Sequence, residues 1–370
     1  MYISFAKFCC QINFALISHS ITYWMRDNGF NIPISIFFGS IFTFPYLLKY
    51  YLAHLITKYF NYFARNPLLL YLFEIFCGLA LTVFPLQSAG FCICALCASS
   101  IGAILDSLLL AEFYSRNINC QTPEKFGATS YGLELVGLII GSDLPFFLSN
   151  YLPWISVYRY TLLVTFIIKL ICIGNKRLDN NQMPLNVIEN FLSCCKQAKN
   201  VIIITVLYKL QSAIISHTPT VYLKSIEYPQ LYISLARLIA HIGMIYAVYK
   251  MRNIYRIENY ISLAIFLKGI LLFLIAGSVY LRYDNWSIIM IIMEKIGRGI
   301  ESCILTSIQA KYSMNSSHFV ALSALSNFVR FFLELFVGFI QNLLGWPAFF
   351  TFVGCVSILV LWQIHKRFSK

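Results

Sequence analysis

The sequence predicts an all-α polytopic membrane protein with about twelve transmembrane helices in two six-helix halves. Of its 370 residues, 59% are hydrophobic and 12% are charged, whereas a soluble domain has about 25% charged residues. The apolar residues form long unbroken runs instead of short alternating strands, which favours helices over a barrel in lipid. A spanning helix needs about 20 apolar residues, so the length leaves room for about twelve spans. This composition excludes an ordinary cytosolic enzyme, a disordered chain and a secreted disulfide scaffold.

Twelve apolar stretches follow one another along the chain. We expect the first to be a span and not a cleavable signal, because it runs directly into Trp24-Met25-Arg26-Asp27 without a small-residue cleavage site. The fifth has a glycine pattern that is typical of a helix packed closely in lipid, with Gly127, Gly132, Gly137 and Gly141. The predicted spans are 4–24, 32–54, 67–86, 90–112, 128–149, 155–174, 200–221, 230–250, 258–280, 286–310, 318–341 and 346–365.

A longer polar segment separates the sixth and seventh apolar stretches, almost at mid-chain. It carries six charged residues, which are Lys176, Arg177, Asp179, Glu189, Lys196 and Lys199. We therefore expect residues 1–174 to form an N-terminal six-helix half, 175–199 a cytoplasmic connector, and 200–370 a C-terminal six-helix half.

The positive charge is distributed unevenly between the two sides of the predicted membrane protein. If the N-terminus is cytoplasmic, the even-numbered connections and both termini hold 17 Lys and Arg residues. The outer connections hold three, Arg26, Lys224 and Arg282. This asymmetry follows the positive-inside rule and places both termini in the cytoplasm. It also explains the net charge of +13 without a nucleic-acid partner, since the basic residues stand singly between apolar segments.

The sequence shows no metal site, cofactor motif or enzyme constellation. Its twelve cysteines form no disulfide framework, and most lie inside apolar runs, where cysteine behaves as a small hydrophobic residue. Cys92, Cys94 and Cys97 are close together but lack a second ligand pair, so we expect no metal. There is no glycine-rich phosphate loop or nucleophile elbow, and we expect no enzymatic activity.

Charged residues inside the predicted spans are the candidates for function, because each costs about 2.5–3.5 kcal/mol at the bilayer centre. Glu294, Arg298 and Glu301 are spaced so that they share one helical face. This stripe indicates either a cation or proton relay in a water-filled cavity or an ion-pair network that locks two helices together. The other residues of this kind are Lys49, Asp106, Glu112, Glu134, Asp143, Lys209, Arg330 and Glu334.

Two of these positions have a particular local context. Asp106 has no basic residue within one helical turn, and a lone membrane carboxylate can exchange protons. The alternative role for Asp106 is hydrogen-bonded packing. Lys49 follows Pro45 on the same helical face, where it can satisfy the carbonyl groups that a proline frees. Arg330 and Glu334, one turn apart, can pair with each other.

Several motifs in register resemble the AmpG-type muropeptide permeases of the major facilitator superfamily. In that family the first span ends in a tryptophan, to which Trp24 corresponds. The second span of the family carries Pro-Tyr followed by a lysine, to which Pro45-Tyr46 and Lys49 correspond. Asp106 is similar to the second aspartate of the family's span-four motif. The later matches are Leu207-Tyr208-Lys209-Leu210, Ser323-Ala324-Leu325, Arg330 and Gly345-Trp346-Pro347-Ala348-Phe349-Phe350. The chain departs from the family at His54, Thr57, Ile101 and Gly102, where the family has Pro, Asp, Gln and Asp.

This resemblance implies a major facilitator fold that imports cell-wall muropeptides across the bacterial inner membrane, driven by protons. The implied partners are a small-molecule substrate, protons and the lipid bilayer, and the implied state is a monomer. The alternatives are a transporter of another anionic solute, such as acetyl-CoA or a host metabolite, and a membrane sensor or scaffold that transports nothing.

The candidate residues then fall into three predicted roles. For proton or substrate coupling they are Asp106, Glu134 and Asp143. For the substrate cavity they are Lys49, Lys209, Arg298, Glu294 and Glu301. For gating or structure they are Pro45, Trp24, Arg330 and Glu334.

Overall fold

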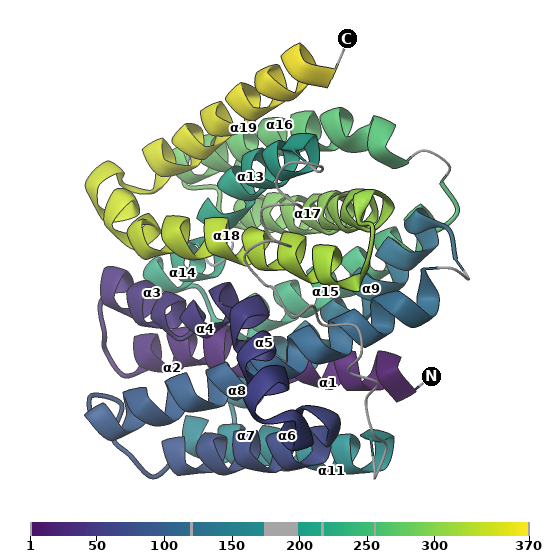
Figure 1. The fold of residues 1–370 in the computed structure, drawn as a ribbon. Helices are drawn as coiled ribbons and strands as arrows, with labels where there is room; N and C mark the ends of the chain where they lie inside the picture. Colours follow the sequence, from purple (N-terminus) through teal and green to yellow (C-terminus); the bar gives the residue numbers. More distant parts are fainter. Residues whose placement is uncertain (1, 119–120, 174–198, 216–217, 255–256, 369–370) are drawn as a thin grey trace.

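A computed structural model describes residues 2–118, 121–173, 199–215, 218–254 and 257–368 of the chain. The predicted connector at 175–199 lies outside these residues, apart from Lys199, so its boundaries stay a prediction. The described residues form helices and no strand, which confirms the all-α fold class. In Figure 1 the purple-to-blue helices of the first part of the chain gather in one half of the bundle, and the green-to-yellow helices in the other.

The helices up to residue 173 follow the predicted spans, with two of the spans broken into shorter pieces. They are α1 (Tyr2–Ala15), α2 (Ile21–Asp27), α3 (Ile32–Ile41), α4 (Phe44–Leu47), α5 (Lys49–Tyr59), α6 (Asn61–Arg65), α7 (Pro67–Leu81), α8 (Ala89–Asn117), α9 (Pro123–Leu138), α10 (Leu144–Leu148) and α11 (Trp154–Ile173). Five-residue π-helical turns, Leu16–Ser20 and Ile139–Asp143, join α1 to α2 and α9 to α10.

The helices from residue 199 onward are longer. They are α13 (Lys199–Ile214), α14 (Thr218–Ser225), α15 (Gln230–Met251), α16 (Ile261–Tyr280), α17 (Asp284–Tyr312), α18 (Ser316–Leu344) and α19 (Trp346–Phe368). A 3₁₀ turn, Ile257–Tyr260, precedes α16.

Among the described residues, eight helical segments are by themselves long and apolar enough to cross a membrane. The other four predicted spans fall short for identifiable reasons. The first two are broken, α7 has only 15 residues, and α17 carries six charged side chains in its 29 residues. These four segments depend on their neighbours to shield them from lipid.

The second predicted span, 32–54, is not one helix as the sequence suggested. The Thr43 hydroxyl donates to the Ser40 carbonyl at 2.7 Å and ends α3. Pro45 has no N–H to continue the ladder and starts the short α4. After a second break at Leu48, α5 begins at Lys49 and continues to Tyr59. The two breaks direct Tyr46 and Lys49 toward the interior of the bundle.

The two π-helical turns lie against each other and carry polar residues into the protein. Gly141, in the second turn, packs so closely on the Ile12 carbonyl that a Cβ atom would overlap it. This contact agrees with the close packing predicted for the fifth span. Each turn places a functional candidate, His19 in the first and Asp143 in the second, beside the centre of the molecule.

The two halves meet through α9 against α15 and α17, and through α3 against α18. Small residues allow the closest approaches. A Cβ atom on Gly338 of α18 would lie 2.8 Å from the Pro33 Cα. A Cβ atom on Gly127 of α9 would lie 2.8 Å from the backbone nitrogen of Ser307 in α17. Backbone contact of this kind leaves no space for a larger side chain.

We expect Gly127→Ala to lower the stability of the protein by about 1–3 kcal/mol, because the methyl group meets backbone atoms that cannot move aside alone. Thermal unfolding of the purified protein in detergent measures this change. Gly132→Ala on the same helix is the control, since nothing lies within 4 Å of its Cβ position. Equal melting temperatures for the two variants would contradict the close packing.

Candidate functional site

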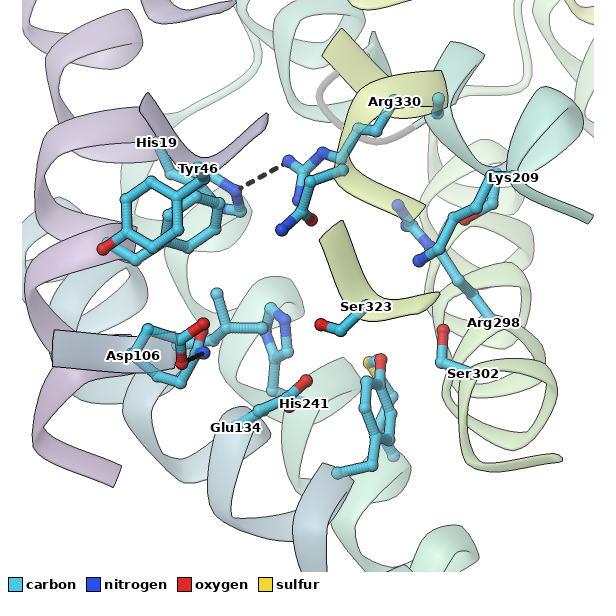
Figure 2. Close-up of a pocket in the computed structure, with 18 of the residues that line it drawn as sticks. His19, Tyr46, Asp106, Glu134, Lys209, His241, Arg298, Ser302, Ser323 and Arg330 are labelled. Carbon is cyan, nitrogen blue, oxygen red and sulfur yellow. Dashed lines mark hydrogen bonds between the residues drawn. The ribbon is translucent and has the colours of Figure 1, made fainter. Parts of the chain in front are cut away.

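A cavity of about 180 Å³ lies between the two halves, near the middle of the bundle. Figure 2 shows its polar side chains converging from helices of both halves. The polar and charged residues that line it are Gln11, His19, Tyr23, Tyr46, Lys49, Asp106, Tyr131, Glu134, Lys209, Ser212, Arg237, His241, Lys295, Arg298, Ser302, Ser323, Asn327 and Arg330. A smaller adjoining cavity shares Glu134, Lys209 and Ser323 with it.

The charges of this lining are divided unequally between the halves. In the described residues, the N-terminal half contributes the two carboxylates, Asp106 and Glu134, with one cation, Lys49. The C-terminal half contributes cations and no carboxylate to the lining, namely Lys209, Arg237, Lys295, Arg298 and Arg330. The cavity is therefore acidic and polar on one wall and strongly basic on the other.

Lys49 and Asp106 form a buried ion pair that also reaches the opposite half. The Lys49 ammonium donates to Asp106 Oδ2 at 2.8 Å and to the Ser323 hydroxyl of α18 at 2.9 Å. Gln11 donates to the other carboxylate oxygen at 3.3 Å. Asp106 has no basic residue within one turn of its own helix, and it pairs instead with Lys49 of α5. Two sequence-predicted residues are brought together here.

A second ion-pair cluster joins Asp143 to two residues of α15. Arg237 donates through Nε and Nη2 to Asp143 Oδ1 at 2.9 and 2.6 Å. His241 Nδ1 lies 2.5 Å from the other oxygen, Oδ2. The Arg237 guanidinium also stacks on Tyr23 and Phe146, 4.4 and 4.9 Å from the ring centroids. Asp143 is fully buried behind the lining and holds the two halves together.

Arg330 and Glu334 pair within α18, as the sequence suggested, with 2.8 Å between Nε and Oε1. Arg330 also donates to His19 Nε2 of the first half at 3.2 Å and lies over the Phe14 ring. Figure 2 draws this hydrogen bond across the cavity. The arginine therefore forms a third polar connection between the halves.

The charged stripe on α17 separates into two different environments. Arg298 lines the cavity and donates to Glu294 at 3.1 Å. Glu294 and Glu301 are fully buried and are not among the residues that line the cavity. Glu301 instead accepts a hydrogen bond from Lys268 of α16 at 3.1 Å. The helix-locking role that the sequence left open applies to Glu301, while Arg298 reaches the cavity.

Lys295 is the most unusual cation of the basic wall. It is 5% exposed, lines the cavity, and has no hydrogen-bond or ion-pair partner among the described residues. The charged groups around it are the arginines Arg237 and Arg298 and the carboxylates Asp143 and Glu294. Lys209 on α13 lines both cavities, and the charged groups around it include Glu134, Glu334 and Arg330. These two ammonium groups are available to a ligand.

The remaining sequence candidates lie outside the cavity. Trp24 is 5% exposed and packs its ring against Phe91 and Tyr158. Pro45 is buried at the start of α4, next to Tyr46. Glu112 pairs with Arg116 one turn later. These residues shape the helices that carry the cavity.

Four lining residues, Arg237, Lys295, His19 and His241, were not among the candidates that the sequence predicted. A usable signal was present, because Arg237 precedes His241 by one turn in the middle of a predicted span. Lys295 adjoins Glu294 in the charged stripe.

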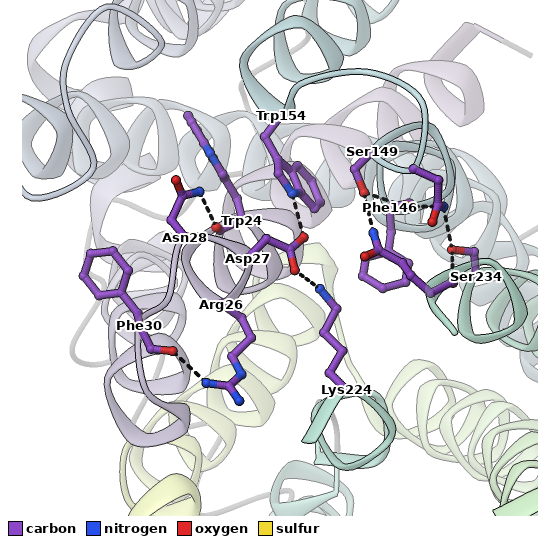
Figure 3. A network of polar contacts seen from close by, with 12 residues as sticks. Trp24, Arg26, Asp27, Asn28, Phe30, Phe146, Ser149, Trp154, Lys224 and Ser234 are labelled. Atoms are coloured by element: carbon purple, nitrogen blue, oxygen red, sulfur yellow. Dashed lines mark hydrogen bonds and ion pairs between the residues drawn. The ribbon is translucent and has the colours of Figure 1, made fainter. Parts of the chain in front are cut away.

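Polar contacts join the two halves where α2 meets α14. Figure 3 shows Asp27, at the end of α2, between Lys224 of the other half and the Trp154 indole. Lys224 forms an ion pair with Asp27, and Trp154 donates to the same carboxylate at 2.7 Å. Alongside, Gln230 donates to Ser149 at 3.0 Å, again between halves.

A second set of contacts joins the halves where α8 meets α17. The Tyr114 hydroxyl donates to the Ser313 carbonyl at 2.7 Å, and its ring stacks on Phe319 with centroids 4.9 Å apart. Tyr50 and Ser317 share a hydrogen bond of 2.9 Å between their hydroxyl groups. Polar contacts thus join the two halves at both of these places.

We expect Lys49→Met and Asp106→Asn each to destabilise the protein by about 3–5 kcal/mol, because each leaves an unpaired buried group. The double variant is expected to lose less than the sum of the two changes. Thermal unfolding in detergent gives these values, with exposed Lys125→Met as a control that leaves the melting temperature unchanged. Additive losses would show that the pair contributes no coupling.

We expect Asp27→Lys to open the α2–α14 end, because it places like charges together. A cysteine at position 212 in the cavity, in a cysteine-free background, should then react several-fold faster with a membrane-impermeant maleimide. The double variant Asp27→Lys/Lys224→Asp restores an ion pair and should slow the reaction again. Equal rates in all three proteins would mean that this pair does not close the cavity.

Comparison with proteins of known structure identifies the fold. No protein-family model and no curated protein match the chain. The chain is similar to the proton:xylose symporter XylE, with 9% identity and a TM-score of 0.72 over 100% of this chain and 95% of that one. It is similar to the human organic anion transporter MFSD10, with 13% identity and a TM-score of 0.71 over 98% of both chains. A POT family transporter in complex with a thioalcohol-conjugated peptide has 15% identity and a TM-score of 0.72, over 100% of this chain and 95% of that one.

The chain therefore has the major facilitator superfamily fold and is a multi-pass membrane protein. These three similar structures are described as transporters. At these identities the similarity concerns the fold, and the cargo must be argued from the cavity.

Proposed function

We propose that this protein is a secondary transporter of a small organic anion. The observation that carries the proposal is the basic wall of the cavity, with five cations from the C-terminal half and no carboxylate in its described lining. Buried cations without partners are costly in a membrane. A negatively charged cargo would pair with Lys295 and Lys209 through a carboxylate or a phosphate group.

Two separate sets of contacts between the halves support alternating access to this cavity. They include Asp27 with Lys224 where α2 meets α14, and Tyr114 with Ser313 where α8 meets α17. Opening one set while keeping the other exposes the cavity to one side only. Rocking of two halves around a central site is the motion that such a fold uses.

The orientation in the membrane follows from the distribution of positive charge. The α8–α17 end carries the connections that are rich in Lys and Arg, including Arg116 and Lys125. The positive-inside rule assigns this end to the cytoplasm and the α2–α14 end to the outer side. We propose the bacterial inner membrane as the location, with both termini cytoplasmic, as the resemblance to muropeptide permeases implies.

Within the anion class, we propose a muropeptide as the cargo and protons as the driving ion. The sequence motifs at Pro45-Tyr46, Lys49 and Asp106 support this assignment, and Asp106, Glu134 and Asp143 are the proposed coupling carboxylates. The cavity of about 180 Å³ is smaller than the usual volume of a ligand site, about 300–1,000 Å³. We therefore expect it to hold the acidic part of the cargo and to widen when one end opens.

The test is uptake of labelled anhydro-muropeptide into proteoliposomes, with and without a proton gradient. We expect gradient-driven uptake that an uncoupler abolishes, and competition by acidic but not by neutral cell-wall sugars. Uptake of another anion, such as acetyl-CoA, in place of muropeptide would retain the anion proposal and change the cargo. No uptake of any anion would favour the sensor or scaffold.

Lys295→Met is expected to lower kcat/KM for uptake about 10- to 100-fold, since a hydrogen bond to a charged group contributes about 1.5–3 kcal/mol. Exposed Lys125→Met is the matched control and should leave uptake unchanged. Unchanged uptake by the Lys295 variant would remove this residue from the binding site.

Asp106→Asn is expected to uncouple uptake from the proton gradient while facilitated exchange of the anion continues. Counterflow in the absence of a gradient measures the exchange. Gradient-driven uptake at the wild-type rate would assign proton coupling to another carboxylate.

A further inference from the structure

A fully buried ion pair lies behind the wall of the cavity in the N-terminal half. Lys169 of α11 donates to Glu74 Oε2 of α7 at 2.7 Å, and the two side chains are 0% and 1% exposed. The Lys169 ammonium also lies 4.2 Å from the centroid of the Tyr71 ring. The sequence-based charge count assigned Lys169 to the cytoplasmic connection, but the structure places it inside α11. Neither member of this pair lines the cavity.

Two buried oxygen atoms near this pair have no hydrogen-bond partner among the described residues. One is Glu74 Oε1, the oxygen that Lys169 does not bind, and the other is the Tyr46 hydroxyl. Unpartnered buried polar atoms are rare and require an explanation. Tyr46 is 3% exposed and lines the cavity, and in Figure 2 its hydroxyl points away from Lys209 and Arg298 on the basic wall.

Gly102 brings these two oxygen atoms together. A Cβ atom on Gly102 would lie 2.7 Å from Glu74 Oε1 and 2.7 Å from the Tyr46 hydroxyl. Since both oxygens lie that close to one point, their separation is no more than about 5.4 Å. One water molecule with a hydrogen bond of ordinary length to each oxygen spans such a separation. Any larger residue at position 102 would stand between them.

We propose that Tyr46 connects Glu74 to the cavity through one bound water molecule over Gly102, and that Glu74 is a proton acceptor of the protein. A hydronium ion in the cavity gives its excess proton to the Tyr46 oxygen and becomes water, while the hydroxyl proton of Tyr46 moves through the bound water to Glu74. Tyr46 ends neutral and Glu74 becomes a carboxylic acid. Lys169 keeps its proton, so the half gains one positive charge.

The surroundings of Glu74 limit where that proton can come from. The titratable groups near Glu74 and Tyr46 in the described chain are Lys169 on α11, Tyr71 and Cys77 on α7, Cys10 on α1 and Asp106 on α8. Tyr71 is hydrogen-bonded to Cys10 and does not line the cavity. Tyr46 and Asp106 both line the cavity. Of these two residues, Tyr46 has the hydroxyl oxygen that lies next to Gly102.

This relay adds a proton route to the proposed transport function, and its role in transport rests on that proposal. The charge that the N-terminal half gains on protonation of Glu74 is compensated when an anion occupies the basic wall. Binding of the cargo and uptake of the proton therefore favour each other. The relay itself can be tested without any cargo, so its failure is distinguishable from the failure of the transport proposal.

Infrared difference spectroscopy of the purified protein in detergent tests the relay. We expect lowering the pH to produce a carboxylic-acid C=O band that is absent in Glu74→Gln. The double variant Glu74→Gln/Lys169→Met removes the same band without leaving an unpaired lysine, if the single variant does not fold. In Tyr46→Phe we expect the band to remain, with at least 10-fold slower hydrogen–deuterium exchange.

Tyr71→Phe is the matched control, because it removes a hydroxyl beside the same ion pair but off the route to the cavity. Its exchange should match that of the wild type. Gly102→Ala should slow the exchange as Tyr46→Phe does, while Gly132→Ala should not. Absence of a Glu74 band, or equal exchange in Tyr46→Phe and Tyr71→Phe, would overturn the proposal.

Discussion

The low polarity of the membrane interior is the constraint on which this structure depends, because every charge placed there needs a partner. Asp106 pairs with Lys49, Asp143 with Arg237 and His241, and Glu74 with Lys169. Several of these pairs fix one helix to another, and the Asp143 cluster fixes one half to the other. The few cations left without a carboxylate then identify the site where a ligand completes the structure.

The contacts between the halves are suited to a structure that must also separate. Glycine at positions 127 and 338 gives close backbone contact without interlocking side chains. The polar contacts at the two ends, at Asp27 and at Tyr114, can exchange for water when they open. The deep ion pairs inside each half, such as Glu301 with Lys268, keep each half intact during such a motion.

Hydropathy alone predicted the fold class and the order of the spans, since lipid imposes the same length and apolarity on each. It did not predict the breaks at Thr43 and Leu48 or the π-helical turns, because these depend on local hydrogen bonds within stretches that remain apolar. The candidate site was predicted in part. Lys49, Asp106, Glu134, Lys209 and Arg298 do line one cavity. Arg237 and Lys295 were missed because the residues around them come from helices that are distant in the sequence. The spacing of residues along the chain does not reveal such contacts.

The unequal division of charge between the two walls has a consequence for how such a protein can diversify. The carboxylates that line the cavity, Asp106 and Glu134, belong to the first half of the described chain, and Lys209, Arg237, Lys295, Arg298 and Arg330 belong to the second. Under the function proposed above, substitutions on α13, α17 and α18 would alter which anion is recognised without touching the carboxylates proposed for proton coupling. Recognition of the cargo and coupling to protons would then be encoded in separate stretches of the gene, so that one could change in evolution while the other is retained.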